Sequence, residues 1–265
     1  MKGLTGRVVL ITGASSGIGY SAALAFAEKK CKVAVCARRE DRLRELSTKI
    51  ETKNGECLYR IVDVAEQAQV HEFTREVRRR WGRVDIVVAN AGYGYLANVE
   101  EIEAQEMERI WKVNFMGTLY SIQAAIPYMK EQGAGHIVIT SSVVGRYSLP
   151  MSSAYCATKF AQVALGQALR VELKQSHIGV TMVYPGYTST EFGEAQLNPK
   201  KRSRNQSRRG QHPDEVASAI VKAVLKNKKE IYPNLQGSVF AHAGLYTPWL
   251  LDEALAIAIK RYGRI

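Results

Sequence analysis

The sequence predicts an α/β fold, in which a doubly wound parallel sheet of about seven strands carries helices on both faces. Short, apolar, β-branched runs alternate with longer amphipathic or alanine-rich runs. This alternation is typical of repeated strand–helix–strand units. No linker interrupts it between residues 7 and 184, so we expect a single domain over residues 1–265.

The expected elements follow the alternation in order. Strands are expected near residues 7–12, 31–36, 57–62, 85–89, 136–140, 178–184 and 229–232. Helices are expected near residues 17–29, 40–53, 66–81, 103–131, 152–175 and 213–227, and a further helix-like stretch covers 249–261.

The first strand–helix turn has the composition of an anion-binding loop. It reads Gly-Ala-Ser-Ser-Gly-Ile-Gly over residues 13–19. Glycine lets the backbone approach a ligand closely, and the N–H groups at the start of the next helix favour a phosphate. The alternative is a flexible turn, but the position favours a dinucleotide site. The candidate cofactor contacts here are Gly13, Ser15, Ser16, Gly17, Ile18 and Gly19.

The end of the second strand favours NADP(H) over NAD(H). An enzyme that prefers NAD usually places a carboxylate there, whereas this chain continues with Arg38 and Arg39. The guanidinium group can donate two parallel hydrogen bonds to a 2′-phosphate. Arg38 is the stronger candidate and Arg39 the weaker. The alternative is a solvated basic start to the helix at 40–53.

Tyr155 and Lys159 stand four residues apart within an expected helix. Residues at this spacing lie on one helix face, so the ammonium group lies close to the phenol. A nearby cation stabilises the phenolate and lowers a tyrosine pKa that is ordinarily about 10. Alone, the pair can be two surface side chains. Together with the glycine-rich turn it predicts a site for proton transfer.

With these motifs in place, the chain resembles the classical short-chain dehydrogenases/reductases, which have a Rossmann fold. Further motifs match in the family's order. Asp63-Val64 looks like the family's adenine-contacting pair, and Asn90-Ala91-Gly92 looks like the motif after its fourth strand. Asn114 looks like the family's helix asparagine. Pro185-Gly186, with Thr188 and Thr190, looks like the loop on the nicotinamide side. The family serine lies thirteen residues before the tyrosine, which selects Ser142 over Ser141. One departure is Ala89, where many relatives have a second asparagine.

The resemblance implies a hydride transfer between the nicotinamide and a carbonyl or secondary alcohol substrate. Tyr155 would be the general acid/base, and Ser142 would orient the substrate oxygen. Lys159 would lower the tyrosine pKa and hold the nicotinamide ribose. Asn114 would hold a water that links Lys159 to solvent and resupplies the proton.

Each of these residues also has a plainer interpretation. Asp63 could cap the following helix, Asn90 could be a turn former, and Ser142 could be an ordinary loop hydroxyl. Asn114 is a poor helix former and, if buried, implies a kink or a polar network. The five histidines and four cysteines have no metal-ligand spacing, so no metal site is expected.

The net charge of +12 could suggest a nucleic-acid partner. Half of it comes from one segment, which contains Lys200, Lys201, Arg202, Arg204, Arg208 and Arg209. By resemblance, a variable substrate lid covers about 188–212, so the basic 200–209 loop is either a lid that attracts anionic substrates or a solvated loop. With no dedicated motif, we expect no nucleic-acid partner.

The C-terminal region contains an uncharged stretch, Gly237–Leu251. It is too short to span a bilayer and fits core packing or a subunit contact; a membrane-surface anchor is the less favoured interpretation. No export signal is visible and cysteines are few, so a cytoplasmic location is expected. By resemblance, we expect a homodimer or homotetramer formed through the helices at 103–131 and 152–175.

The leading functional prediction is an NADPH-dependent carbonyl reductase or alcohol dehydrogenase. A 3-oxoacyl reductase of lipid synthesis is the alternative within the same family. A non-catalytic NADP(H)-binding sensor is the alternative of a different class, because one fold can serve several functions. The intact set of Ser142, Tyr155, Lys159 and Asn114 favours an enzyme.

Overall fold

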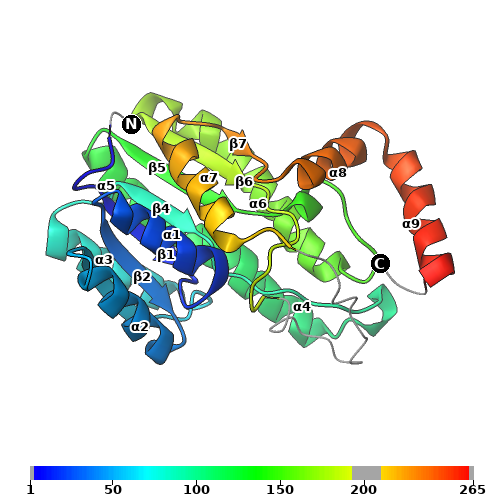
Figure 1. Cartoon of the computed structure of the whole chain (residues 1–265), viewed down its shortest axis with the longest axis horizontal. Coiled ribbons are helices and arrows are strands. Elements are labelled where there is room, and N and C mark those ends of the chain that lie inside the picture. Colours follow the sequence, from blue (N-terminus) through cyan, green and yellow to red (C-terminus); the bar gives the residue numbers. More distant parts are fainter. Residues whose placement is uncertain (1–2, 193–209, 263–265) are drawn as a thin grey trace.

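The computed structural model describes residues 3–192 and 210–262. Its centre is a seven-stranded sheet in the order β3-β2-β1-β4-β5-β6-β7, with every pair parallel (Figure 1). The strands are β1 Val8–Thr12, β2 Lys32–Ala37, β3 Glu56–Ile61, β4 Ile86–Ala89, β5 Gly135–Thr140, β6 Ile178–Val183 and β7 Glu230–Ile231. The doubly wound parallel sheet predicted from the sequence is therefore confirmed.

Helices cover both faces of the sheet. The α-helices are α1 Gly17–Glu28, α2 Glu40–Glu51, α3 Gln67–Trp81, α4 Ala104–Trp111, α5 Gly117–Glu131, α6 Ser153–Glu172, α7 Pro213–Leu225, α8 Leu235–Tyr246 and α9 Pro248–Tyr262. Short 3-10 turns lie at Val99–Glu101, Val143–Gly145 and Lys174–Ser176, and a π-helical turn at Lys112–Met116 joins α4 to α5.

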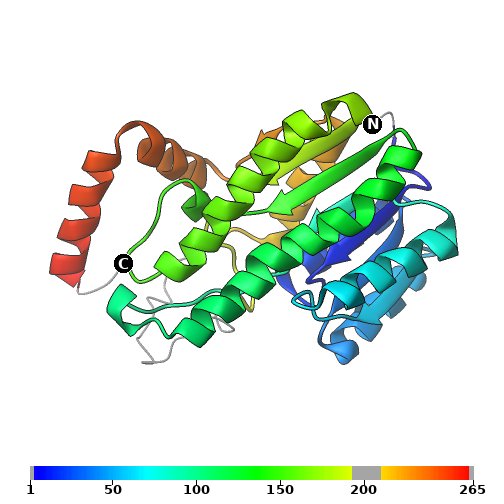
Figure 2. The ribbon, with the colours of Figure 1, turned by 180° about the vertical axis from the view of Figure 1, so that it is seen from behind.

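Two apolar cores sandwich the sheet, because successive strand residues point to opposite faces. Val9 and Ile11 of β1 face a core shared with α1, α2 and α7. Val8 and Leu10 face the other core, which is shared with α3, α5 and α6. Figure 2 shows the second layer of helices from behind. Both faces of the central strands are buried, as expected for a parallel sheet.

The expected helix over 103–131 is interrupted by the π-helical turn at Lys112–Met116. Asn114 lies in this turn and is fully buried. A π-helical turn inserts one extra residue and redirects the side chains around it. Here it points the Asn114 amide towards the segment that follows β4.

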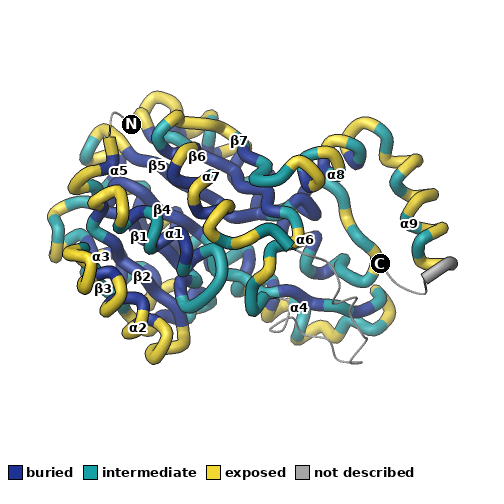
Figure 3. The backbone as a smooth tube through the Cα atoms, viewed as in Figure 1, coloured by how far each residue is buried: buried dark blue, intermediate teal, exposed yellow. Residues whose placement is uncertain are grey.

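The C-terminal region forms two helices that extend beyond the end of the sheet (Figure 1). α9 corresponds to the expected helix-like stretch, whereas α8 was not predicted. Most residues of α9 are exposed, as the tube in Figure 3 shows, and they include Trp249, Leu250 and Ile257. Within residues 3–192 and 210–262, no helix is both long and apolar enough to cross a membrane.

Candidate active site

The glycine-rich turn lies at the carboxyl edge of the sheet, where ligands of such sheets bind. Gly13 has a φ of +67°, and a Cβ there would lie 2.6 Å from the Cα of Ala91. A Cβ on Gly19 would lie 2.4 Å from the carbonyl oxygen of Gly13. Glycine is therefore required where backbone meets backbone. The side chain of Ser16 makes no capping bond to α1, which begins at Gly17, so the first N–H groups of the helix are available to an anion.

Asn90 ties this turn to the end of β4. Its Nδ2 donates hydrogen bonds to the carbonyl oxygens of Thr12 and Gly13, at 3.2 Å each. The backbone N–H groups of Asn90 and Ala91 donate to Oγ1 of Thr12 at 3.1 and 3.3 Å. These bonds bring two predicted cofactor segments together.

Ile18, another predicted residue of the glycine-rich turn, packs against the core on the α1 face of the sheet.

The two candidate arginines have different surroundings. Arg38 is exposed at the end of β2. Arg39, the weaker candidate from the sequence, donates from Nε and Nη2 to Oγ of Ser15 at 3.3 and 3.2 Å. Arg39 also forms an ion pair with Glu191 at 2.8 Å, and Arg42 lies 3.6 Å from the same carboxylate. Arg39 thus bridges the glycine-rich turn and the segment after β6.

Asp63 and Val64 follow β3 on the same edge of the sheet. Oδ1 of Asp63 accepts a hydrogen bond from the backbone of Ala65 at 3.0 Å. The residue at the N-terminus of α3 is Glu66, so Asp63 does not cap that helix. Val64 is buried against Gly117, where an added Cβ would lie 2.7 Å from its Cγ2.

Ser142 and Tyr155 are brought together at the end of β5. Oγ of Ser142 accepts from the backbone N–H of Val144 at 3.3 Å and lies 3.4 Å from the carbonyl oxygen of Pro185. The side chain of Ser142 lies close enough to the Tyr155 phenol to lower its pKa. Tyr155 lies in the first turn of α6, and the ring of Phe192 lies 5.6 Å from its ring.

Lys159 is buried one turn further along α6. Its Nζ donates to the carbonyl oxygen of Thr140 at 2.9 Å and to Oε1 of Gln162 at 3.1 Å. The same Nζ lies 5.5 Å from the centre of the Tyr155 ring. Two of its three hydrogens therefore have protein acceptors, and the ammonium group stays beside the phenol.

Burial controls the protonation of this pair. It raises the pKa of Tyr155 well above its ordinary value, an effect that Cys156 reinforces and the side chain of Ser142 opposes. Burial also lowers the pKa of Lys159 to about 7. The spacing predicted a lowered tyrosine pKa, but this structure gives a raised one, because burial removes water from the phenol and so disfavours the phenolate.

Asn114 is held by protein groups on every side. Its Oδ1 accepts from the backbone N–H of Tyr93 at 3.0 Å. Its Nδ2 donates to the carbonyl oxygen of Tyr93 at 3.0 Å and to Oγ1 of Thr158 at 3.1 Å. A Cβ on Gly92 would lie 3.1 Å from Oδ1 of Asn114. The predicted polar network is therefore present, and it fixes the segment that follows Asn90-Ala91-Gly92.

The loop after β6 reaches back over the glycine-rich turn. The carbonyl oxygen of Pro185 accepts from the backbone of Val143, and Oγ1 of Thr188 donates to the carbonyl of Gly186, both at 3.1 Å. Thr190 lies against Gly17, where an added Cβ would lie 3.0 Å from its Cγ2. The predicted basic 200–209 loop lies outside the described residues.

The fold places the glycine-rich turn and the cluster of Ser142, Tyr155 and Lys159 at the same edge of the sheet. Comparison with known proteins identifies the family that has these motifs. The family model for short chain dehydrogenases matches residues 7–201. The chain belongs to the short-chain dehydrogenase/reductase family. This dehydrogenase/reductase is 32% identical over 236 residues to a Dehydrogenase/reductase SDR family protein 7-like of Drosophila melanogaster, covering 86% of this chain and 72% of that protein.

Two solved structures of relatives extend the comparison. An alcohol dehydrogenase from Thermococcus sibiricus complexed with 5-hydroxy-NADP is 32% identical, with a TM-score of 0.75 over 85% of this chain and 95% of that one. A short-chain dehydrogenase/reductase from Burkholderia phymatum in complex with NAD is 25% identical, with a TM-score of 0.85 over 95% and 97%. One of these two structures therefore holds an NADP analogue and the other holds NAD.

Two residues beside this dehydrogenase site were missed from the sequence. Gln162 is fully buried and contacts Lys159, Asn114 and Thr118. Its position three residues after Lys159 on the same helix was the available signal. Glu191 contacts Arg39, but only the folded loop brings this carboxylate to the cofactor edge.

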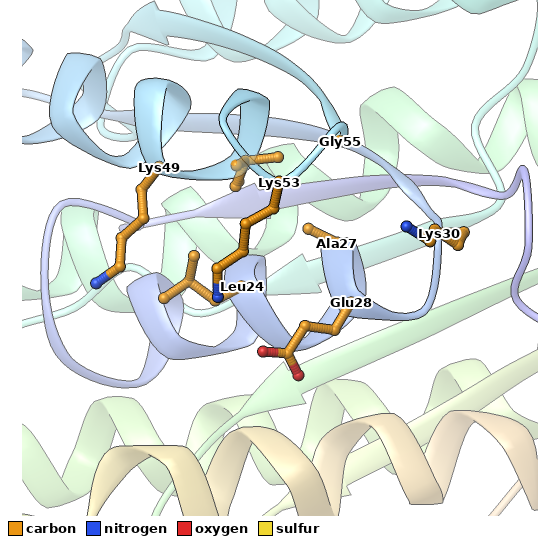
Figure 4. Close-up of a pocket in the computed structure, with 8 residues that line it drawn as sticks. Leu24, Ala27, Glu28, Lys30, Lys49, Lys53 and Gly55 are labelled. Atoms are coloured by element: carbon orange, nitrogen blue, oxygen red, sulfur yellow. The ribbon is translucent and has the colours of Figure 1, made fainter.

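Hollows in the surface of the described part of the chain include one near α1 and one near α9. The hollow in Figure 4 has a volume of about 210 Å³ and lies between the C-terminal ends of α1 and α2, lined by Lys30, Lys49 and Lys53 among others. It is at the opposite edge of the sheet from the glycine-rich turn. The second, of about 370 Å³, is lined by Leu149, Met151 and Ser153 and by α9. It adjoins the loop that leads to Tyr155.

Proposed function

We propose that the chain is an NADP(H)-dependent oxidoreductase that transfers a hydride between the nicotinamide and a carbonyl or secondary alcohol substrate. The observation that carries the proposal is the cluster of Ser142, Tyr155 and Lys159, at the carboxyl end of β5 and on α6. It lies on the same sheet edge as the glycine-rich turn. A phenol, a hydroxyl and an ammonium group at a nucleotide site fit proton transfer to a carbonyl oxygen.

The residues present fit a dinucleotide. The close approach of Gly13 to Ala91 and the free N–H groups at the start of α1 suit a pyrophosphate, and Asp63 and Val64 would lie beside the adenine. The nicotinamide, when bound, supplies or accepts the hydride. Pro185, Gly186, Thr188 and Thr190 would border its ring.

NADP(H) is proposed over NAD(H) because Arg38 and Arg39 follow β2 and no carboxylate stands in their place. Arg39 already contacts Ser15 of the glycine-rich turn. Its ion pair with Glu191 is exposed, so a 2′-phosphate can compete for the same guanidinium at small cost.

The side chains can serve the reductive direction. The Tyr155 phenol is neutral at neutral pH, so it would donate its proton to a developing alkoxide. Ser142 would donate a hydrogen bond to the same oxygen and orient it. Lys159 would place its remaining hydrogen towards the ribose hydroxyls or the phenol. In the oxidative direction the same groups act in reverse.

A substrate panel tests this proposal. Ketones, aldehydes and acyl thioesters are offered with NADPH and, separately, with NADH, and nicotinamide absorbance is followed. We expect oxidation of NADPH with a ketone or aldehyde. Faster turnover of 3-oxoacyl thioesters would favour the 3-oxoacyl reductase. Tight NADPH binding without turnover of any substrate would favour the non-catalytic sensor.

We also propose a cytoplasmic homodimer or homotetramer. Phe160 and Val171 of α6 are large apolar side chains that are 43% and 77% exposed, which suits a contact with a second copy. The four cysteines are free in the structure, in keeping with a reducing compartment. The molar mass in solution, measured by light scattering, tests the assembly.

A further inference from the structure

A buried amide joins Lys159 to the backbone of Asn114. Oε1 of Gln162 accepts a hydrogen bond from Nζ of Lys159 at 3.1 Å. Nε2 of Gln162 donates to the carbonyl oxygen of Asn114 at 2.7 Å and to Oγ1 of Thr118 at 2.8 Å. Gln162, Asn114 and Thr118 are at most 2% exposed, and Lys159 is 3% exposed. The amide oxygen and both hydrogens of the amide nitrogen of Gln162 therefore have protein partners.

The orientation of this amide is determined by its neighbours. The hydroxyl of Thr118 donates its single hydrogen to the carbonyl of Asn114 at 2.8 Å, so it can only accept from Gln162. The ammonium group of Lys159 can only donate. The nitrogen of the amide must therefore face Asn114 and Thr118, and its oxygen must face Lys159.

The same bonds leave Asn114 little capacity for a water. Its carbonyl oxygen accepts from both Gln162 and Thr118, which uses its two lone pairs. Both hydrogens of its side-chain amide are donated to Tyr93 and Thr158. The family resemblance predicted a water between Asn114 and Lys159. In this chain the carboxamide of Gln162 lies between them.

We infer that Gln162 is a positioning residue, which holds the ammonium group of Lys159 beside Tyr155 and replaces the expected water link to Asn114. This inference rests on the proposed function. A water can accept a proton and donate another at the same oxygen, whereas the NH2 group of an amide only donates, so Gln162 cannot relay a proton between Asn114 and Lys159 in the same way. Protons would then reach Tyr155 through the side of Lys159 that faces the substrate and cofactor, not through Asn114.

The surroundings of Lys159 make the role of Gln162 measurable. Tyr155 is the titratable group beside the ammonium. β5 presents the neutral carbonyl of Thr140, and α6 presents Gln162. Within the described residues, no carboxylate lies within ion-pairing distance of Lys159. A change in the acceptor at position 162 should therefore move the titration of Lys159 directly.

The test compares Gln162→Leu, Gln162→Glu and Thr118→Val. Loss of the acceptor in Gln162→Leu should shift the titration of Lys159 down by about 1–2 pH units, because the charged form loses a hydrogen bond that the neutral form needs less. A carboxylate in Gln162→Glu should shift it upward. Thr118→Val is the matched control, because it removes a partner of the amide nitrogen but keeps the bond between Oε1 and Nζ.

Two readouts separate this inference from the proposed function. The first is the NMR titration of Lys159 in protein with ¹³C-labelled lysine, assigned with Lys159→Arg, and it requires no turnover. The second is the pH profile of kcat with the best carbonyl substrate, which should move in the same direction. Opposite shifts in the two Gln162 variants and none in Thr118→Val support the role. Unmoved titrations, or equal shifts in all three variants, overturn it. Expected NMR shifts without any turnover would contradict only the proposed function.

Discussion

At the scale of single residues, burial decides what Tyr155 and Lys159 can do. The phenol is driven towards its neutral form, and the pKa of Lys159 falls to about 7. The phenol therefore stays neutral at neutral pH, whereas Lys159 can be charged or neutral there, and small changes around it shift that balance. The spacing of four residues could predict that the two side chains meet. It could not predict how much water the fold removes from them.

The arginines after β2 give a prediction at this scale. Arg38→Asp and Arg39→Asp should each lower the ratio of kcat/KM for NADPH to that for NADH by roughly 10–100-fold, because each loses a charge-assisted bond to the 2′-phosphate and adds repulsion. Steady-state kinetics with both cofactors measure the ratio. An unchanged ratio in both variants would refute the assignment of NADP(H).

At the scale of elements, the loop after β6 is fastened to α2 by charge. Glu191 pairs with Arg39 at 2.8 Å, and the guanidinium of Arg39 holds the pKa of the Glu191 carboxyl below its usual value. The bond lies across the edge where the ribose 2′-position is proposed to bind. Entry of NADPH would therefore compete with this carboxylate.

This competition predicts that Glu191→Gln binds NADPH a few-fold more tightly, since an exposed ion pair contributes up to about 1 kcal/mol. Affinity for NADH should stay unchanged, because NADH has no 2′-phosphate. Titration of protein fluorescence with each cofactor measures both values. Glu45→Gln is the matched control: Glu45 lies 3.7 Å from Arg42 within α2 and makes no bond to Arg39. Equal effects in the two variants would contradict the competition.

Strands and the main sheet-flanking helices were predictable because apolar periodicity is a local property. The π-helical turn was not, because it depends on what Asn114 meets: the backbone of Tyr93 and the hydroxyl of Thr158. The role of Gln162 was not predicted for the same reason, because two of its partners are distant in the sequence. Thr118 on α5 is 44 residues away, and Asn114 in the π-helical turn is 48 residues away. α8 has apolar residues around its circumference and offered no periodicity to detect.

At the scale of the whole molecule, stability should depend on a histidine inside the sheet. His136 in β5 is 2% exposed, and its Nε2 lies 2.8 Å from Oγ1 of Thr181. That hydroxyl donates to the carbonyl of Lys228, so it accepts from His136. Burial lowers the pKa of His136 to about 4, so the native state resists protonation of the ring.

The sign of the pH effect follows from this shift. Between pH 6.5 and about 4 the unfolded chain binds a proton at His136 that the native state does not. Stability is therefore complete above pH 6.5 and falls by about 3 kcal/mol as the pH drops to 4. Urea unfolding across this range should show the loss in the wild type and a smaller one in His136→Gln. His177→Asn, at an exposed position, should behave as the wild type; equal pH dependence in all three proteins would contradict the assignment.

The most direct test of the central claim is NADPH-dependent turnover by Tyr155→Phe, measured beside its affinity for NADPH and with Tyr147→Phe as the control. Tyr147 bonds to Asp252 and the carbonyl of Pro248 rather than to the Ser142 cluster. Loss of the phenol hydroxyl should lower kcat by roughly 10²–10⁴-fold, the usual contribution of a general acid, with NADPH affinity and folding retained. Near-normal turnover in Tyr155→Phe would show that another group transfers the proton.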